Sequence, residues 1–152
     1  MRRSLIVALV FGAALMVFAG PASAGDNFAA PMSGDAEVPS VDTQAAGVAT
    51  FKLGDEGLAF KVNVANIDNV IAAHIHCGAV GVNGPVGVTL FRGGPDTVNG
   101  TLAAGVITAP DPGNACGWTD LATVVAALDG GATYVNVHTT AHPGGEIRGQ
   151  VK

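Results

Sequence analysis

Apolar and polar residues alternate with the two-residue period of β-strands along most of the chain after its first two dozen residues. The clearest case is LAFKVNV at 58–64, in which every second residue is apolar. Asp55-Glu56-Gly57 precedes it and predicts a turn, so this segment and the one before it are expected to form a hairpin. Seven segments are predicted to be strands: 47–53, 58–64, 70–77, 86–91, 100–108, 134–138 and 146–151.

One segment follows the helical period instead. In residues 119–128 four apolar side chains recur at spacings of three and four, which places them on one face of a helix. Thr119 is the expected N-cap, and Gly130-Gly131 is expected to end the helix. Seven short strands, frequent glycine turns and one short helix predict an all-β protein. We expect an antiparallel, Greek-key-like β-sandwich.

The N-terminus has the three parts of a secretory signal peptide. Arg2 and Arg3 precede an apolar run at 5–19, and Ala22-Ser23-Ala24 supplies the small residues of a cleavage site. The apolar run is shorter than the roughly 20 residues that a membrane-spanning helix needs. We therefore expect residues 1–24 to be removed after Ala24. This leaves residues 25–152 as one secreted or periplasmic domain without a membrane span.

The charge balance excludes one class of partner. Only 12% of the residues are charged and the net charge is −5. Removing residues 1–24 takes away Arg2 and Arg3 but no acid, so the mature chain carries −7. No segment concentrates Lys and Arg, as binding to a phosphate backbone requires, so nucleic acid is not an expected partner. A metal ion, or an extracellular or periplasmic protein that the sequence does not identify, remains possible as a partner.

The two cysteines, Cys77 and Cys116, are an even pair in a chain that we expect to be exported. A disulfide is the first interpretation, because exported proteins fold in an oxidising compartment. The alternative makes Cys77 a thiolate metal ligand beside His76. Strand geometry disfavours it, because adjacent residues of a strand point to opposite faces.

The four histidines fall into two short segments, AHIH at 73–76 and HTTAH at 138–142. On a strand, His74 and His76 share one face, and His138 shares a face with other polar residues of its own strand. Two imidazoles at this spacing and a third from a neighbouring strand make a three-nitrogen site that suits zinc or copper. The sequence thus nominates His74, His76 and His138 as the first metal ligands.

Three further residues could complete such a site. His142 follows the strand and could act as a fourth ligand, and Glu146 and Glu37 could supply oxygen ligands or accept a hydrogen bond from an imidazole N–H. Glu146 belongs to PGGEIRGQ at 143–150, which predicts a turn into a final strand. The alternative interpretation has no metal. In it, the histidines hydrogen-bond to threonine, asparagine and backbone carbonyl groups and hold loops together.

Four segments together carry a family resemblance. SGDAEVP at 33–39, AHIH at 73–76, YVNVHT at 134–139 and PGGEIRGQ at 143–150 resemble the motifs of the CHRD domain, in the family's order. This module is named for its copies in chordin, an extracellular developmental antagonist, and it also occurs in secreted bacterial proteins. The resemblance spans about Phe28 to Val151 and implies a secreted β-sandwich. The bacterial members of the family are largely without an assigned activity.

A looser likeness links the chain to copper–zinc superoxide dismutase, an exported Greek-key sandwich with H-x-H on a strand and an internal disulfide. The chain lacks that enzyme's later glycine-rich run with a bridging histidine and its cluster of zinc ligands. The first hypothesis is therefore a non-enzymatic CHRD protein whose histidine-lined site binds copper or zinc. The alternatives are an interaction or structural module without metal, and a small dismutase-like metalloenzyme.

Overall fold

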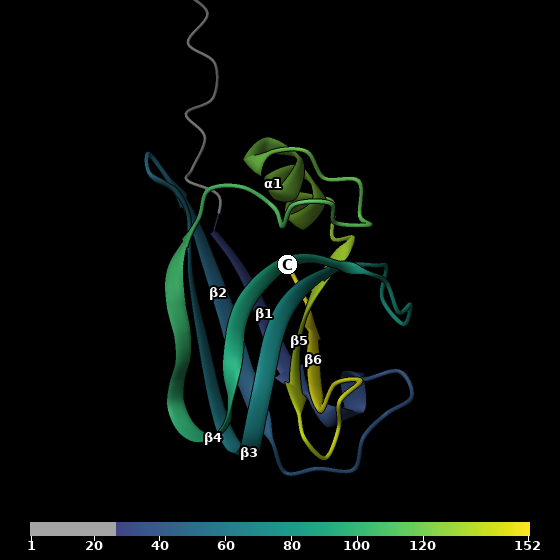
Figure 1. Ribbon diagram of the computed structural model, residues 1–152. Helices are drawn as coiled ribbons and strands as arrows, with labels where there is room; N and C mark the ends of the chain where they lie inside the picture. Colours follow the sequence, from purple (N-terminus) through teal and green to yellow (C-terminus); the bar gives the residue numbers. More distant parts are fainter. Residues whose placement is uncertain (1–26) are drawn as a thin grey trace, which may run out of the picture.

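The computed structural model describes residues 27–152, and the predicted signal peptide at 1–24 lies outside the described residues. This part of the chain is all-β with one short α-helix, and every strand pairing in it is antiparallel (Figure 1). The elements are β1 (Asn27–Ser33), a 3-10 turn η1 (Gly34–Ala36), β2 (Ala46–Gly54), β3 (Gly57–Cys77), β4 (Val86–Ile107), α1 (Leu121–Asp129), β5 (Thr133–Thr139) and β6 (Ile147–Gln150).

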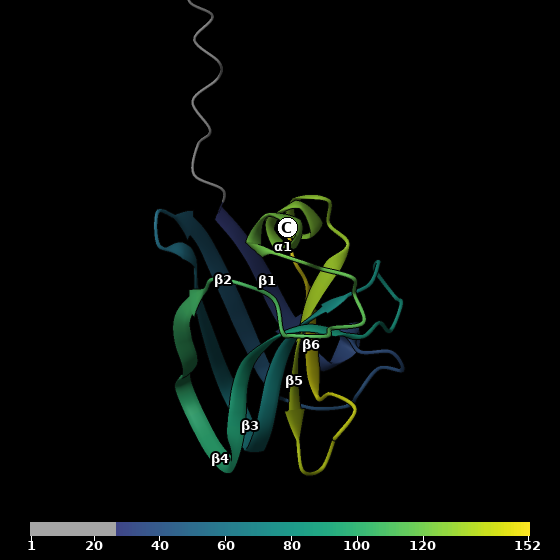
Figure 2. The ribbon, with the colours of Figure 1, turned by 45° about the horizontal axis from the view of Figure 1, so that its top comes forward.

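The strands form one sheet that closes on itself, which corrects the expectation of a Greek-key sandwich. Their order is β2-β1-β6-β5-β3-β4, and β2 also pairs with β3, so five strands make a barrel while β4 lies along β3 (Figures 1 and 2). Closure is possible because β3 is 21 residues long. Its first half pairs with β2 and its second half pairs with β5.

Two pairs of predicted strands are halves of longer ones. Segments 58–64 and 70–77 belong to β3, and segments 86–91 and 100–108 belong to β4. The alternation of apolar and polar residues is interrupted between the two halves of β3. At this point Asn66 and Asn69 adopt left-handed backbone angles, with φ of 54° and 55°. These positions interrupt the alternation and shift the register against β4, and pairing resumes after each shift.

The strand β1 was not predicted from the sequence. Its centre is Ala29-Ala30-Pro31, which has low strand propensity and a proline that cannot donate to a ladder. The strand nevertheless pairs with β2 along its whole length, and Phe28 lies opposite Phe51. Burial of these two phenylalanines in the core outweighs the weak local propensity of the alanines and proline.

The predicted helix is confirmed, with a small shift at its start. Asp120, not Thr119, is the N-cap: its carboxylate accepts a hydrogen bond from the Thr123 N–H at 2.8 Å. The Thr123 hydroxyl oxygen accepts the Asp120 N–H at 3.2 Å in return, which makes a capping box. Gly130 forms the C-cap as expected. The helix α1 lies at one end of the barrel (Figure 1).

The barrel divides each strand into a core-facing and an outward-facing set of side chains. Ile75, Val135, Val137 and Ile147 are fully buried inside, as the alternation predicts for Ile75 and the two valines. Polar side chains occupy the outer face of β3, β5 and β6. Three connecting segments, 34–45, 78–85 and 140–146, hydrogen-bond to this face. The histidines therefore lie between the barrel wall and its loops.

Candidate metal centre

The register between β3 and β5 brings three histidines together. His74 lies opposite Asn136, His76 lies opposite Tyr134, and His138 is two residues further along β5. All three belong to the outward set of their strands, so their imidazoles converge on the face that the loops cover. The residues that the sequence nominated as first ligands are thus neighbours in the fold.

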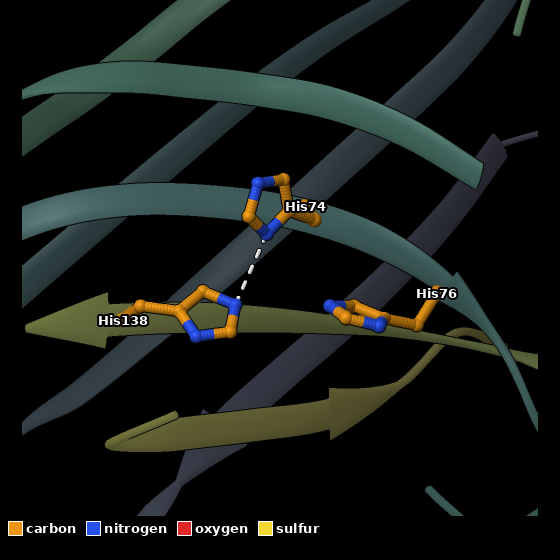
Figure 3. Close-up of side chains that lie close together, drawn as sticks. All are labelled: His74, His76 and His138. Atoms are coloured by element: carbon orange, nitrogen blue, oxygen red, sulfur yellow. Dashed lines mark hydrogen bonds between the residues drawn. The ribbon is translucent and has the colours of Figure 1, made fainter. Parts of the chain in front are cut away.

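The imidazoles are close enough to share one ion. One ring nitrogen from each lies within 4.8 Å of those of the other two. Nδ1 of His74 is 3.0 Å from Nε2 of His138, and the His76 ring points toward this pair (Figure 3). The His76 ring centroid lies 5.6 Å from that of His74 and 5.9 Å from that of His138. Small movements of the rings would place all three nitrogens at the distance of about 2 Å that zinc and copper require.

Backbone carbonyl groups fix the protonation of two of the rings. Nδ1 of His76 lies 2.9 Å from the carbonyl oxygen of Gly84, and Nδ1 of His138 lies 2.9 Å from that of Pro143. A carbonyl oxygen only accepts hydrogen bonds, so each ring carries its proton on Nδ1 and donates it. Nε2 of both rings is left unprotonated, with its lone pair directed toward the cluster. This is the tautomer that metal-binding histidines commonly adopt.

One of these lone pairs has no partner. Nε2 of His76 is buried, and no donor among residues 27–152 forms a hydrogen bond with it. A buried polar atom without a hydrogen bond is costly and uncommon in folded proteins. A metal cation placed between the three rings would satisfy this nitrogen. The unpartnered Nε2 of His76 therefore indicates that the three histidines fit a metal ion.

All three imidazoles are held in the neutral form that binds metals. Burial is the largest cause that lowers the pKa of His76 and of His138, and each of these residues is only 8% exposed. The pKa of His74 is lowered to about 4, mainly by burial and then by repulsion from the other two histidines and Arg92, while Asp111 opposes the shift. At neutral pH a metal therefore has little competition from protons.

The other two nominated ligands are not part of this three-histidine cluster. Both carboxylate oxygens of Glu146 accept hydrogen bonds from hydroxyl groups, one from Thr43 at 2.8 Å and one from Thr139 at 2.7 Å. His142 lies in the loop after β5, where its backbone N–H donates to the hydroxyl of Thr139 at 3.1 Å. The fold uses these residues to close the loop at 140–146.

Glu37 also has a different partner from the imidazole N–H that the sequence suggested. Its carboxylate accepts the side-chain N–H of Asn136, at 2.8 and 3.1 Å to its two oxygens. Burial raises the pKa of Glu37 to about 7, while Arg148 and the Asn136 bond act to lower it. Asn136 lies opposite His74 in the sheet, so Glu37 borders the histidine face without joining the cluster.

The CHRD domain family matches residues 28–151, from the second residue of β1 to the residue after β6. The chain belongs to the CHRD domain family. No curated protein and no solved structure compared with the chain matches it significantly. In the part of the chain that the structure describes, no helix is long and apolar enough to cross a membrane.

The disulfide predicted for this CHRD domain is confirmed. Cys77, the last residue of β3, is bonded to Cys116 in the segment before α1, with their Cα atoms 5.8 Å apart. The bond removes Cys77 from the possible metal ligands, because a bonded sulfur is not a thiolate. Cys77 directly follows His76, so the disulfide also anchors the end of the strand that carries two of the histidines.

Tyr134 and Gly84 were not named from the sequence as parts of the site, and for Arg148 in the final strand the sequence left open a buried, site-lining role or an ordinary solvated strand face. Tyr134 stacks its ring on that of His76, with centroids 4.8 Å apart and planes inclined by 8°. Cζ of Arg148 lies 3.4 Å from the centroid of the Tyr134 ring. The carbonyl oxygen of Gly84 accepts the hydrogen bond from Nδ1 of His76. Strand alternation does put Tyr134 on the same face as His138. Nothing in the sequence pattern indicates which loop carbonyl meets which imidazole.

Proposed function

We propose that this CHRD domain is an exported, non-enzymatic protein that binds one copper or zinc ion through His74, His76 and His138. The observation that carries the proposal is the buried, unpartnered Nε2 of His76, which points toward the other two rings (Figure 3). The hydrogen bonds among the described residues do not satisfy this lone pair, and most buried polar atoms in folded proteins have a partner.

The chemistry of the donor set favours these two metals. Three neutral imidazoles suit copper and zinc, whereas magnesium and calcium prefer oxygen ligands. The carboxylates nearest to the cluster are already engaged, Glu37 with Asn136 and Glu146 with two threonines. Both cysteines are in the disulfide. A nitrogen-only site with three ligands is what remains.

Export is part of the proposal and has independent support. The residues at 1–24 have the pattern of a signal peptide, and a disulfide is typical of proteins outside the cytosol. The CHRD resemblance points the same way, since the family occurs in extracellular and secreted proteins. Amino-terminal sequencing of the exported protein would test cleavage after Ala24. A mature chain that retains Arg2 and Arg3 would contradict it.

The metal site is tested by titration against a chelator of known affinity. The wild-type protein should bind one equivalent of copper or zinc. His74→Ala, His76→Ala and His138→Ala should each weaken binding by roughly 100-fold or more, because each removes one of three ligands. His142→Ala is the matched control, since this fourth histidine lies outside the cluster, and it should leave the affinity unchanged. Unaltered uptake in the first three variants would refute the site.

A second candidate is an extracytoplasmic interaction or structural module without metal. It is favoured by the bonds from His76 and His138 to the carbonyls of Gly84 and Pro143, which tie two loops to the barrel. On this hypothesis the histidine variants lower the melting temperature, and added metal has no effect on either the variants or the wild type. Metal-dependent stabilisation of the wild type alone would decide for the metal site.

A further inference from the structure

The ring of Tyr134 lies between the imidazole of His76 and the guanidinium of Arg148. β5 is placed between β3 and β6 in the sheet, so Tyr134 meets His76 on one side and Arg148 on the other. The centroids of the Tyr134 and His76 rings are 4.8 Å apart in a nearly parallel stack, and Cζ of Arg148 is 3.4 Å from the centroid of Tyr134. This three-layer stack connects a candidate ligand with a buried cation.

Arg148 extends the connection to the loop at 78–85. Its side chain is only 2% exposed. Nη1 donates to Oδ1 of Asn83 at 2.9 Å, and Nη2 donates to the carbonyl oxygen of Val82 at 2.7 Å. The planar guanidinium thus packs its face on Tyr134 and directs its edge at the loop, which a lysine could not do with one ammonium group.

The hydroxyl of Tyr134 completes the arrangement at Gly84. It accepts the Gly84 N–H at 3.0 Å and donates to the Gly84 carbonyl oxygen at 3.2 Å. The same carbonyl oxygen accepts Nδ1–H of His76. A Cβ at Gly84 would lie 1.6 Å from the carbonyl oxygen of Cys77, so only glycine permits the loop to approach this closely.

We propose that Tyr134 and Arg148 are positioning residues that direct Nε2 of His76 into the cluster. This role rests on the proposed metal site, because orienting Nε2 of His76 serves a function only if that nitrogen binds a metal. The His76 side chain rotates about two bonds. The stack with Tyr134 fixes the plane of its ring, and the Gly84 carbonyl fixes its tautomer. The Tyr134 hydroxyl donates to that carbonyl, and Arg148 holds the loop that carries it through Asn83 and Val82. Neither residue supplies a ligand.

His138 provides an internal comparison. Its Nδ1–H is held by the carbonyl of Pro143, in a different loop. No ring contact joins it to Tyr134 among the described residues, whereas its ring does lie near those of His74 and His76. A disturbance transmitted through Tyr134 should therefore affect His76 and spare His138.

The first experiment needs no metal. Two-bond ¹H–¹⁵N spectra of the metal-free protein should show His76 and His138 both protonated on Nδ1, with slow exchange of these protons. Tyr134→Phe keeps the ring stack and removes the hydroxyl, and it should accelerate exchange at His76 at least about 10-fold. Arg148→Lys should act in the same direction. Thr43→Val is the matched control, because it removes a hydroxyl that bonds to Glu146.

The second experiment adds Cu(II). Tyr134→Phe should weaken Cu(II) binding by about 10- to 100-fold, the usual effect of removing a group that orients a ligand, and should alter the nitrogen hyperfine pattern in the electron paramagnetic resonance spectrum. Thr43→Val should change neither. If Arg148→Lys does not fold, Tyr134→Phe alone decides the matter.

The metal-free and the Cu(II) experiments distinguish failure of the positioning proposal from failure of the proposed metal site. A wild-type protein that binds neither copper nor zinc would refute the proposed function, and the metal-free spectra would still report on positioning. Unchanged exchange and tautomer of His76 in Tyr134→Phe would overturn the positioning proposal, whatever the wild-type protein binds. Equal disturbance of His76 and His138 would also overturn it, because the effect would then be general loosening of the fold.

Discussion

Nδ1 of His74 lies 3.0 Å from Nε2 of His138, so two nitrogens of the candidate metal site are joined by a hydrogen bond. His138 carries its proton on Nδ1, where it donates to Pro143. The proton between the two rings must therefore belong to His74, which donates it to His138. A metal ion needs both of these lone pairs, and it can take them only if this hydrogen bond is given up.

A change of tautomer at His74 follows from this arrangement. In the metal-free protein we expect His74 to be protonated on Nδ1. After loading with Zn(II), which keeps the spectra diamagnetic, the proton should be on Nε2, because Nδ1 then binds the metal. Two-bond ¹H–¹⁵N spectra of the two forms test this. A His74 that keeps its Nδ1 proton with one equivalent of zinc bound would exclude Nδ1 of His74 as the third ligand atom.

The carboxyl of Glu37 should make the stability of the protein depend on pH. Burial raises its pKa from 4.5 to about 7, so between these values the folded state binds more protons than the unfolded state. The unfolding free energy contributed by this group is therefore full below about pH 4.5 and decreases as the pH rises through 7.

Replacement of Glu37 by Gln removes this titration. The stability of Glu37→Gln relative to the wild type should increase from pH 4.5 to pH 7.5 by about 2 kcal/mol, a value reduced from the full shift because the carboxyl retains some contact with solvent. Urea unfolding at the two pH values measures the difference. Glu56→Gln, in the exposed turn before β3, is the control. A difference that does not change with pH would show that Glu37 has the same pKa in the folded and unfolded states and would contradict the prediction.

Gly84 should tolerate no side chain. Alanine there would place its Cβ 1.6 Å from the carbonyl oxygen of Cys77, so the loop must move and withdraw its carbonyl from His76. We expect Gly84→Ala to cost about 1–3 kcal/mol of stability and to weaken metal binding. Gly54→Ala is the control, because its nearest contact would be an ordinary 3.9 Å. Calorimetry and metal titration give the two readouts, and equal values for both variants would refute the argument.

The disulfide should stabilise the domain and its metal site together. It links residues 39 apart, and loop closure of this length corresponds to about 4 kcal/mol in the chain-entropy treatment. Replacing both Cys77 and Cys116 by Ala should therefore lower the unfolding free energy by up to that amount. It should also reduce metal affinity, since Cys77 adjoins His76. Denaturant unfolding tests the first effect, and an affinity equal to that of the wild type would contradict the second.

The parts of this structure that depend on the local repeat of apolar and polar residues could be predicted from the sequence. Alternation placed Ile75 inside and His74 and His76 outside, and the helix and the disulfide were expected from spacing and composition. The strand β1 was not predicted because its alanines and proline have low strand propensity. The strand is stabilised by the packing of Phe28 in the core, which the local pattern does not show. The closed barrel was missed because it depends on one strand, β3, pairing with different partners along its length. The sequence pattern predicts a break between two strands at Asn66 and Asn69, where β3 in fact continues.

The candidate site divides in the same way. H-x-H on a strand and a histidine on another strand were visible as a pattern, and the register between β3 and β5 joined them. The carbonyls of Gly84 and Pro143, and the stack of Arg148 on Tyr134, depend on how loops close over the barrel. Loop closure is set by long-range packing, so no local pattern predicts which backbone oxygen meets which ring.

The most direct test is the metal content of the mature protein, purified from its native compartment without chelators or a histidine tag and measured by elemental analysis. We expect close to one copper or zinc per chain in the wild type and in His142→Ala, and far less in His76→Ala. Absence of metal from the wild type, together with failed reconstitution, would contradict the metal site and assign the three histidines to a structural network.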